Sequence, residues 1–110
     1  MNWVLPFPRR VHLVDSDETI DYRGKVHWMS AEEAYFAIAD RVLRSDEVQR
    51  VRAEKAFDRI LWKLAHNKPM DPPIVERVKG FPVRSDGQHR VVAAYDLEIE
   101  VPLVVVEVAV

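Results

Sequence analysis

The residues best suited to chemistry lie together in one short stretch, Ser85–Ala94, which reads Ser-Asp-Gly-Gln-His-Arg-Val-Val-Ala-Ala. A strand-like segment precedes this stretch, and its second half has the pattern of a short helix. A glycine turn at a helix start leaves backbone N–H groups without partners, and the helix dipole favours negative charge there. An arginine can grip a phosphate with two hydrogen bonds, and a histidine can add a donor. The stretch therefore predicts a phosphate-binding corner made of Gly87, Gln88, His89 and Arg90.

Asp86, directly before the glycine, is the candidate for acid–base chemistry. Its carboxylate can act as a general base or as a magnesium ligand. The structural alternative is that Asp86 or Ser85 caps the following helix. If the site is catalytic, Asp86 and His89 are the catalytic residues, and His89 and Arg90 stabilise transferred charge in phosphoryl transfer or nucleotide hydrolysis.

A second set of charged residues recurs at helical spacing: Arg52, Lys55, Arg59 and Lys63. On one helix these cations lie on one side and form a ridge that can follow a nucleic-acid backbone. Glu54 and Asp58 dilute the ridge, so a solvated helix face is the plainer interpretation. Trp62 falls beside the ridge, where it is either covered by the N-terminal arm or marks an interface or stacking site.

The spacing of other polar residues does not point to a metal centre. His12 and His27 lie in strand-like segments, and neither has two further ligands at a characteristic spacing. Asp15, Asp17 and Asp21 lack the central glycine and terminal glutamate of a calcium loop. We therefore expect no metal site built from the protein alone.

The elements that must position these residues follow from hydrophobic spacing and turn residues. The predicted strands are Val11–Val14, Lys25–Trp28, Ile74–Val78, Phe81–Arg84 and Val101–Val108. The predicted helices are Ser30–Arg44, Ser45–His66 and Gln88–Leu97. This order of strands, two helices, hairpin, helix and strand indicates a small α+β or mixed α/β domain.

Several local signals support these elements. Ser30-Ala31-Glu32-Glu33 matches a capping box, and Ser45 is expected to cap the second helix. Lys79-Gly80 predicts a hairpin turn. The nearly continuous apolar run of Val101–Val108 predicts a strand buried on both faces. The expected core face of the second helix consists of Phe57, Ile60, Leu61 and Leu64.

Length and composition set the outer bounds. A chain of 110 residues with 48% hydrophobic and 31% charged residues is expected to fold as one soluble domain, residues 1–110. No apolar run is long enough to span a membrane. The absence of cysteine fits a reducing cytoplasm. Few amides and many charges suggest a thermophilic source, and the net charge of −2 restricts any DNA contact to a local patch.

The C-terminal third resembles the ParB/sulfiredoxin superfamily over about residues 69–108. The matching segments are Pro73-Ile74-Val75, Gly80-Phe81-Pro82-Val83, Asp86 to Ala94, and Ile99 to Val105. The family pattern is a strand after a Pro-Ile step, a hairpin, a Gly-x-His-Arg helix start and a closing Val-Pro-Val strand. The resemblance implies a small mixed sheet with about three helices, and a nucleotide phosphate bound at the glycine turn.

The resemblance also implies residue roles. Gly87 would let the backbone approach the phosphate, Gln88 would supply a backbone amide, and His89 and Arg90 would supply side-chain donors. Asp86 resembles the acidic residue that takes part in catalysis in the related ADP-dependent serine kinases. Sulfiredoxins need a cysteine where Gln88 stands, so sulfinic-acid reduction is excluded.

The leading interpretation is a nucleotide- or phosphate-binding ParB-like domain associated with DNA, of the type called ParB-like nuclease. Its ligand would be ATP, ADP or CTP, with Mg²⁺ as a candidate cofactor. One alternative is a small phosphotransferase or nucleotide hydrolase related to ADP-dependent serine kinases, and another is a non-catalytic interaction module. The final strand can lie inside the sheet or pair with a second copy, which leaves an oligomer open.

Overall fold

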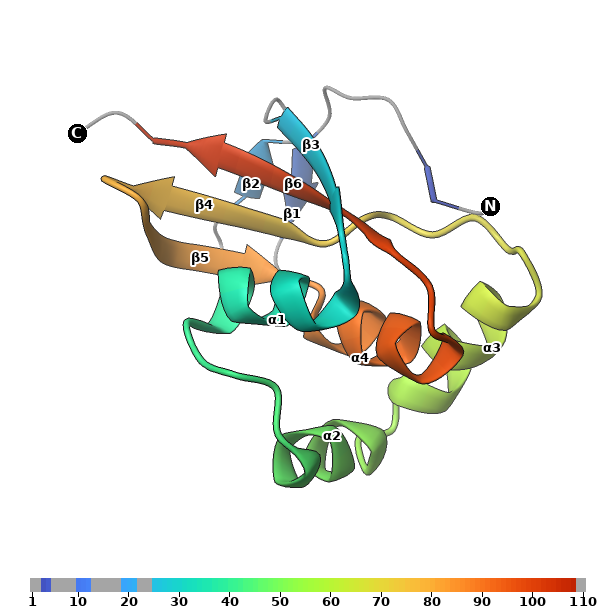
Figure 1. Ribbon diagram of the computed structural model, residues 1–110. Helices are drawn as coiled ribbons and strands as arrows, with labels where there is room; N and C mark the ends of the chain where they lie inside the picture. Colours follow the sequence, from blue (N-terminus) through green and yellow to red (C-terminus); the bar gives the residue numbers. More distant parts are fainter. Residues whose placement is uncertain (1–2, 5–9, 13–18, 22–24, 109–110) are drawn as a thin grey trace.

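A computed structural model describes residues 3–4, 10–12, 19–21 and 25–108 of the chain (Figure 1). The main sheet contains β3 (Lys25–Met29), β4 (Ile74–Val78), β5 (Phe81–Asp86) and β6 (Val101–Glu107). The helices are α1 (Ala31–Ala39), α2 (Ser45–Arg52), α3 (Phe57–Ala65) and α4 (Gln88–Leu97). A separate antiparallel pair joins β1 (Arg10–His12) to β2 (Thr19–Asp21). The predicted α+β class is confirmed, with four described helices where three were expected.

The main sheet has the strand order β3-β6-β4-β5. β6 runs antiparallel to β3 and parallel to β4, while β4 and β5 form an antiparallel hairpin. β6 lies between β3 and β4, and the strand predicted from the apolar run is confirmed. The predicted burial on both faces holds for its first four residues, whereas the last three are partly or fully exposed. The predicted hairpin turn is also confirmed: Lys79 and Gly80 both have positive φ, as a tight two-residue hairpin requires.

α1 begins as predicted but ends early. The Ser30 hydroxyl accepts a hydrogen bond from the Glu33 backbone N–H at 3.1 Å, so the capping box is real. The helix was expected to reach Arg44, and this is wrong: it ends at Ala39, because Asp40 adopts the left-handed conformation that acidic and amide residues tolerate. Val42, expected on the apolar stripe, is consequently exposed.

The predicted helix Ser45–His66 is two helices. α2 ends at Arg52, and α3 begins at Phe57. Val51 and Phe57 are both buried although they are six residues apart, and on a continuous helix they would point in different directions. The break lets both side chains reach the core. Ser45 is the first residue of α2 rather than its cap, and Arg44 occupies the cap position without a side-chain bond.

α4 is the centre of the helical layer, and it was predicted with its observed bounds. It packs against α1, α2 and α3 below the sheet in the view of Figure 1. Its residues Val91–Ala94 are fully buried. At the edge of this core, Trp3 forms a parallel bridge with Met70. The prolines in residues 2–10 predict an extended arm, and the polar run Asp15–Gly24 predicts a loop; both segments lie largely outside the described residues, although the second includes the strand β2.

Candidate functional site

The predicted phosphate corner is the junction between β5 and α4, and Gly87 makes it. Gly87 has a φ of +119° and occupies the cap position of α4. A Cβ atom on this residue would lie 2.6 Å from the Cβ of Pro73, so glycine is required by contact as well as by conformation. Among the described residues no side chain caps this helix: the Ser85 hydroxyl donates to the carbonyl of Ile38 and Asp86 pairs with Arg90, so neither residue has the predicted capping role. The first N–H groups of α4 are therefore free of side-chain caps.

The Arg90 guanidinium lies close to Gly87, with its Cζ 3.3 Å from the place of a Cβ on that residue, and it links two chain segments. Its Nη1 donates to the carbonyls of Asp71 at 2.8 Å and Pro72 at 3.1 Å. Its Nη2 forms an ion pair with Asp86 at 2.9 Å. The Arg90 side chain is only 12% exposed. In this arrangement Arg90 joins the chain before β4 to the end of β5, and a phosphate would have to displace one of these partners to reach it.

Two cavities lie on either side of the Asp86–Arg90 pair. The first, of about 370 Å³, opens beside the glycine turn and is lined by Ile38, Ala39, Arg41, Ser85, Asp86, Gly87, Gln88 and His89. The second, of about 470 Å³, is lined by Val4, Ile60, Lys63, Pro69, Met70, Asp71, Asp86 and Arg90, so Asp86 lines both. The first cavity thus gathers Asp86 and three of the four predicted phosphate-binding residues, and we call it the turn cavity.

Arg41 is the residue of the turn cavity that sequence reasoning missed. Its Nε donates to Glu47 at 2.5 Å, and its Nη2 donates to the hydroxyl of Tyr35 at 3.2 Å. Gln88 donates to the same hydroxyl at 3.0 Å, which links the first residue of α4 to the network. Half of the Arg41 side chain remains exposed. Only the early end of α1 brings Arg41 here, so no periodicity in the sequence could have shown it.

The electrostatics of this network hold Arg41 charged. The pKa of the buried Glu47 carboxyl is lowered, first by the hydrogen bond from Tyr35 and further by the hydrogen bond and charge of Arg41. Burial of the carboxyl acts in the opposite direction but does not outweigh them. In return, Glu47 and Tyr35 raise the pKa of Arg41 above its ordinary value. The turn cavity therefore has a fixed cation on one wall and the positive end of a helix on the other.

His89 reaches from the turn toward the α2–α3 connection. Its Nε2 donates to the Glu54 carboxylate at 2.6 Å, and Glu54 also accepts a hydrogen bond from Arg50 at 3.3 Å. The ring is partly exposed beside the turn cavity. His89 is thus held in place by a carboxylate that lies outside the cavity lining.

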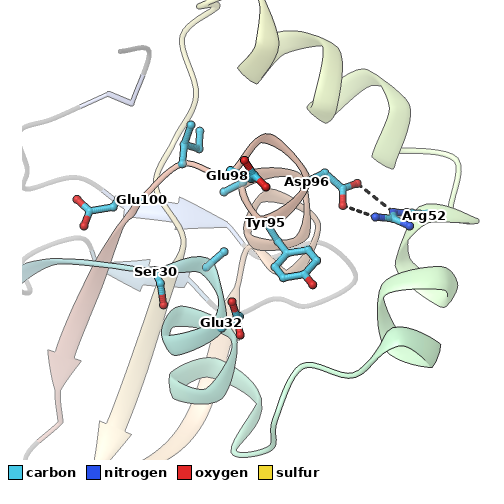
Figure 2. A pocket seen from close by; sticks show the side chains of 10 residues that line it. Ser30, Glu32, Arg52, Tyr95, Asp96, Glu98 and Glu100 are labelled. Atoms are coloured by element: carbon cyan, nitrogen blue, oxygen red, sulfur yellow. Dashed lines mark hydrogen bonds and ion pairs between the residues drawn. The ribbon is translucent and has the colours of Figure 1, made fainter.

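A larger cavity, of about 570 Å³, lies at the opposite end of α4 and was not predicted (Figure 2). Its lining contains four acidic residues, Glu32, Asp96, Glu98 and Glu100, together with Tyr95. Its cation, Arg52, is paired with Asp96, to which its Nε donates at 3.0 Å; this contact raises the pKa of Arg52. We call this space the acidic cavity.

The predicted basic ridge is not a single helix face. Arg52 belongs to α2 and pairs with Asp96 of α4, Lys55 lies in the connection, and Arg59 and Lys63 lie on α3. Trp62 is 52% exposed, so the described part of the chain does not bury it.

The remaining observations concern metals, membranes and relatives. Within the described ranges, no three His, Asp or Glu side chains gather in a group that could hold a metal, and the side chain of His12 is outside them. None of the described helices is long and apolar enough to cross a membrane. Comparison with models of protein families, with curated proteins and with solved structures finds no match for this chain.

Proposed function

We propose that the protein binds a nucleotide through its phosphate groups in the turn cavity. The observation that carries this proposal is an uncapped helix start that opens into a cavity with a fixed arginine on the facing wall. Backbone N–H groups, the helix dipole and a guanidinium are the groups that recognise phosphate in proteins. The likeness of the Gly-x-His-Arg stretch to the ParB/sulfiredoxin superfamily supports the same ligand class.

The residues divide into contact and positioning roles. The N–H groups of Gln88 and His89, with the side chains of His89 and Arg41, contact the phosphates. Gly87 allows the close approach. Arg90 acts as a positioning residue, because its bonds to Asp71, Pro72 and Asp86 hold the turn in its observed shape. The candidate ligands are ATP, ADP and CTP.

A catalytic version of the same proposal rests on Asp86. Its carboxylate lines the turn cavity, and about a third of the side chain is exposed. From that position it can bind Mg²⁺ or act as a general base toward a bound phosphate, which is the chemistry of a phosphotransferase or nucleotide hydrolase. Phosphate release that is lost in Asp86→Asn, with nucleotide binding retained, would establish this version. Nucleotide binding without turnover would leave a non-catalytic binding domain.

Thermal unfolding in the presence of ATP, ADP, CTP or pyrophosphate, with and without Mg²⁺, tests the binding. A ligand held only by the folded state at a hundred times its Kd stabilises that state by about 2.7 kcal/mol. We expect the stabilisation to shrink strongly in Arg41→Gln and His89→Ala, each compared with its own unliganded melting temperature. Lys55→Ala and Glu98→Gln are the matched controls, since both change an exposed charge away from the turn cavity.

Two results of this experiment would contradict nucleotide binding in the turn cavity. If none of these compounds raises the melting temperature at millimolar concentration, the proposal is wrong. If a nucleotide stabilises wild type and Arg41→Gln equally, the phosphates are bound elsewhere, and the cavity beside Arg90 is the next candidate.

A further inference from the structure

The outer face of α3 carries an exposed aromatic side chain that is already held in position. The imidazole of His66 stacks on the ring of Trp62, with centroids 4.4 Å apart and planes 22° apart. The Nδ1 of His66 donates to the Trp62 backbone carbonyl at 2.8 Å, which fixes the imidazole against the indole. Half of Trp62 is nevertheless open to solvent. A large aromatic surface that is ordered before binding costs little entropy to use.

The charge around Trp62 is strongly local. Between Lys55 and Lys68 the chain has four lysine or arginine residues and one acidic residue, a net charge of +3 in a chain of −2. Arg59 precedes Trp62 by three positions, so it lies beside Trp62 on the helix, and Lys63 lies beside Arg59 one turn further along. The Lys68 ammonium lies 5.8 Å from the centre of the Trp62 ring. We call this surface, made of Arg59, Trp62, Lys63, His66 and Lys68, the α3 face.

We propose that the α3 face binds a single strand of nucleic acid, with one base stacked on the Trp62–His66 pair. The cations complement a phosphate backbone, and the aromatic pair complements the flat face of an unpaired base. A duplex offers the same phosphates but keeps its bases inside the stack, so it would use only half of this surface. The site is separate from the turn cavity and goes beyond nucleotide binding there.

A second exposed tryptophan, Trp28, lacks the surroundings of Trp62. Trp28 on β3 is 46% exposed, nearly as much as Trp62. Within the described part of the chain it stacks on no other ring and has no cation over it. The two tryptophans therefore share exposure and differ in stacking and charge, which makes Trp28 a matched control.

The experiment is fluorescence anisotropy with labelled oligothymidine, oligouridine and a duplex of equal length, at low and moderate salt. We expect both single strands to bind more tightly than the duplex, and the affinity to fall as salt rises. Loss of the stacking surface in Trp62→Ala should weaken single-strand binding by about tenfold, and Trp62→Phe should recover most of it. Trp28→Ala should bind like wild type.

Charge is tested in the same assay. Arg59→Gln should reduce the slope of log affinity against log salt by about one, the effect of losing one phosphate contact. Lys25→Gln, an exposed lysine on β3, should leave the slope unchanged. The relative affinities of the DNA and RNA strands distinguish the two sources of this ligand.

Three outcomes would overturn the proposal: no salt-dependent binding of either single strand, preferential binding of the duplex, or equal losses in Trp62→Ala and Trp28→Ala. Because Trp62 and Arg59 are exposed, unchanged melting temperatures of their variants will show that the fold is intact. The variants of the turn cavity are not involved, so failure here leaves nucleotide binding standing.

Discussion

Both ends of α4 open into cavities, but the terminal backbone groups have hydrogen-bond partners at only one of them. At the C-terminal end, the N–H of Ile99 donates to the carbonyl of Ala94 at 3.1 Å and the N–H of Glu98 donates to that of Tyr95 at 3.2 Å. This is the closure by which helices satisfy their own last carbonyls. At the N-terminal end, Gly87 provides no side-chain cap, and the first N–H groups are left for another partner.

The side chains around each end extend the difference. Four acidic residues line the C-terminal cavity, and its arginine, Arg52, pairs with one of them, Asp96 (Figure 2). The N-terminal cavity has one carboxylate, Asp86, and two side chains, Arg41 and His89, whose carboxylate partners lie outside the lining. An anion is therefore favoured at one end of α4 and repelled at the other. Two cavities that both contain charged residues therefore offer different environments, because the backbone groups of the helix end are satisfied in one and available in the other.

The largest expected effect on stability comes from adding a side chain at Gly87, at the open end of α4. Gly87→Ala should destabilise the protein by about 3 kcal/mol or more, because the new Cβ collides with Pro73 and the backbone conformation is strained. Urea unfolding measures the loss. Gly80→Ala, in the hairpin turn, meets no atom within 4 Å and should lose only about 1 kcal/mol from its positive φ. Equal losses for the two variants would mean that Gly87 has no close neighbour.

The next largest effect tests whether Arg90, at the same end of α4, positions the turn or contacts the ligand. Arg90→Ala should lower the free energy of unfolding by about 2–3 kcal/mol, since it removes two hydrogen bonds to the Asp71 and Pro72 carbonyls and the ion pair with Asp86. Arg50→Ala removes an exposed ion pair and should cost under about 0.5 kcal/mol. If Arg90→Ala is fully stable and only the nucleotide response disappears, Arg90 binds the ligand itself.

The pH dependence of the melting temperature tests the contribution of Glu47, the carboxylate partner of Arg41. The native state lowers the pKa of this carboxyl, so its contribution to stability is present above its unfolded pKa, near 4.5, and is lost as pH falls through the folded value. Glu47→Gln should therefore flatten the decline of melting temperature on the acid side of that value. Asp46→Asn, next to it and exposed, is the control that should keep the wild-type slope. Identical slopes for all three proteins would exclude the network as the source.

The smallest effect concerns the closed end. Glu98 has a φ of +55°, a conformation in which glycine is less strained. Glu98→Gly should raise the free energy of unfolding by about 0.5–1 kcal/mol, measured by thermal or urea unfolding. Glu100→Gly removes a carboxylate from the same cavity at a residue without positive φ, and we expect it to destabilise. A gain in both variants would attribute the effect to charge rather than to the backbone.

Short-range signals predicted much of this fold. The capping box at Ser30, the Lys79-Gly80 turn, α4 and the buried β6 all depend on residues close in sequence, and the structure confirms them. The break between α2 and α3 has no local signal, because two of the residues in it, Ala53 and Ala56, are good helix formers. It exists because two buried side chains must face one core.

The candidate site was predicted in part for the same reason. The glycine turn is visible in the sequence, whereas the direction in which Arg90 points depends on Asp71 and Pro72, almost twenty residues earlier. Arg41 enters the site only through the left-handed Asp40. The acidic cavity combines α1, α2 and α4, and no motif spans those segments.

The place of β6 has a consequence for the order in which the protein can be assembled during synthesis. β3 and the β4–β5 hairpin are each made before β6, yet they share no edge in the finished sheet until β6 is inserted between them. A nascent chain that ends before Val101 therefore has β3 as a single strand and the β4–β5 hairpin as a separate fragment, both with open edges, a state prone to aggregation. Pairing β3 with a strand more than seventy residues later also makes this a high-contact-order step, and such steps fold slowly.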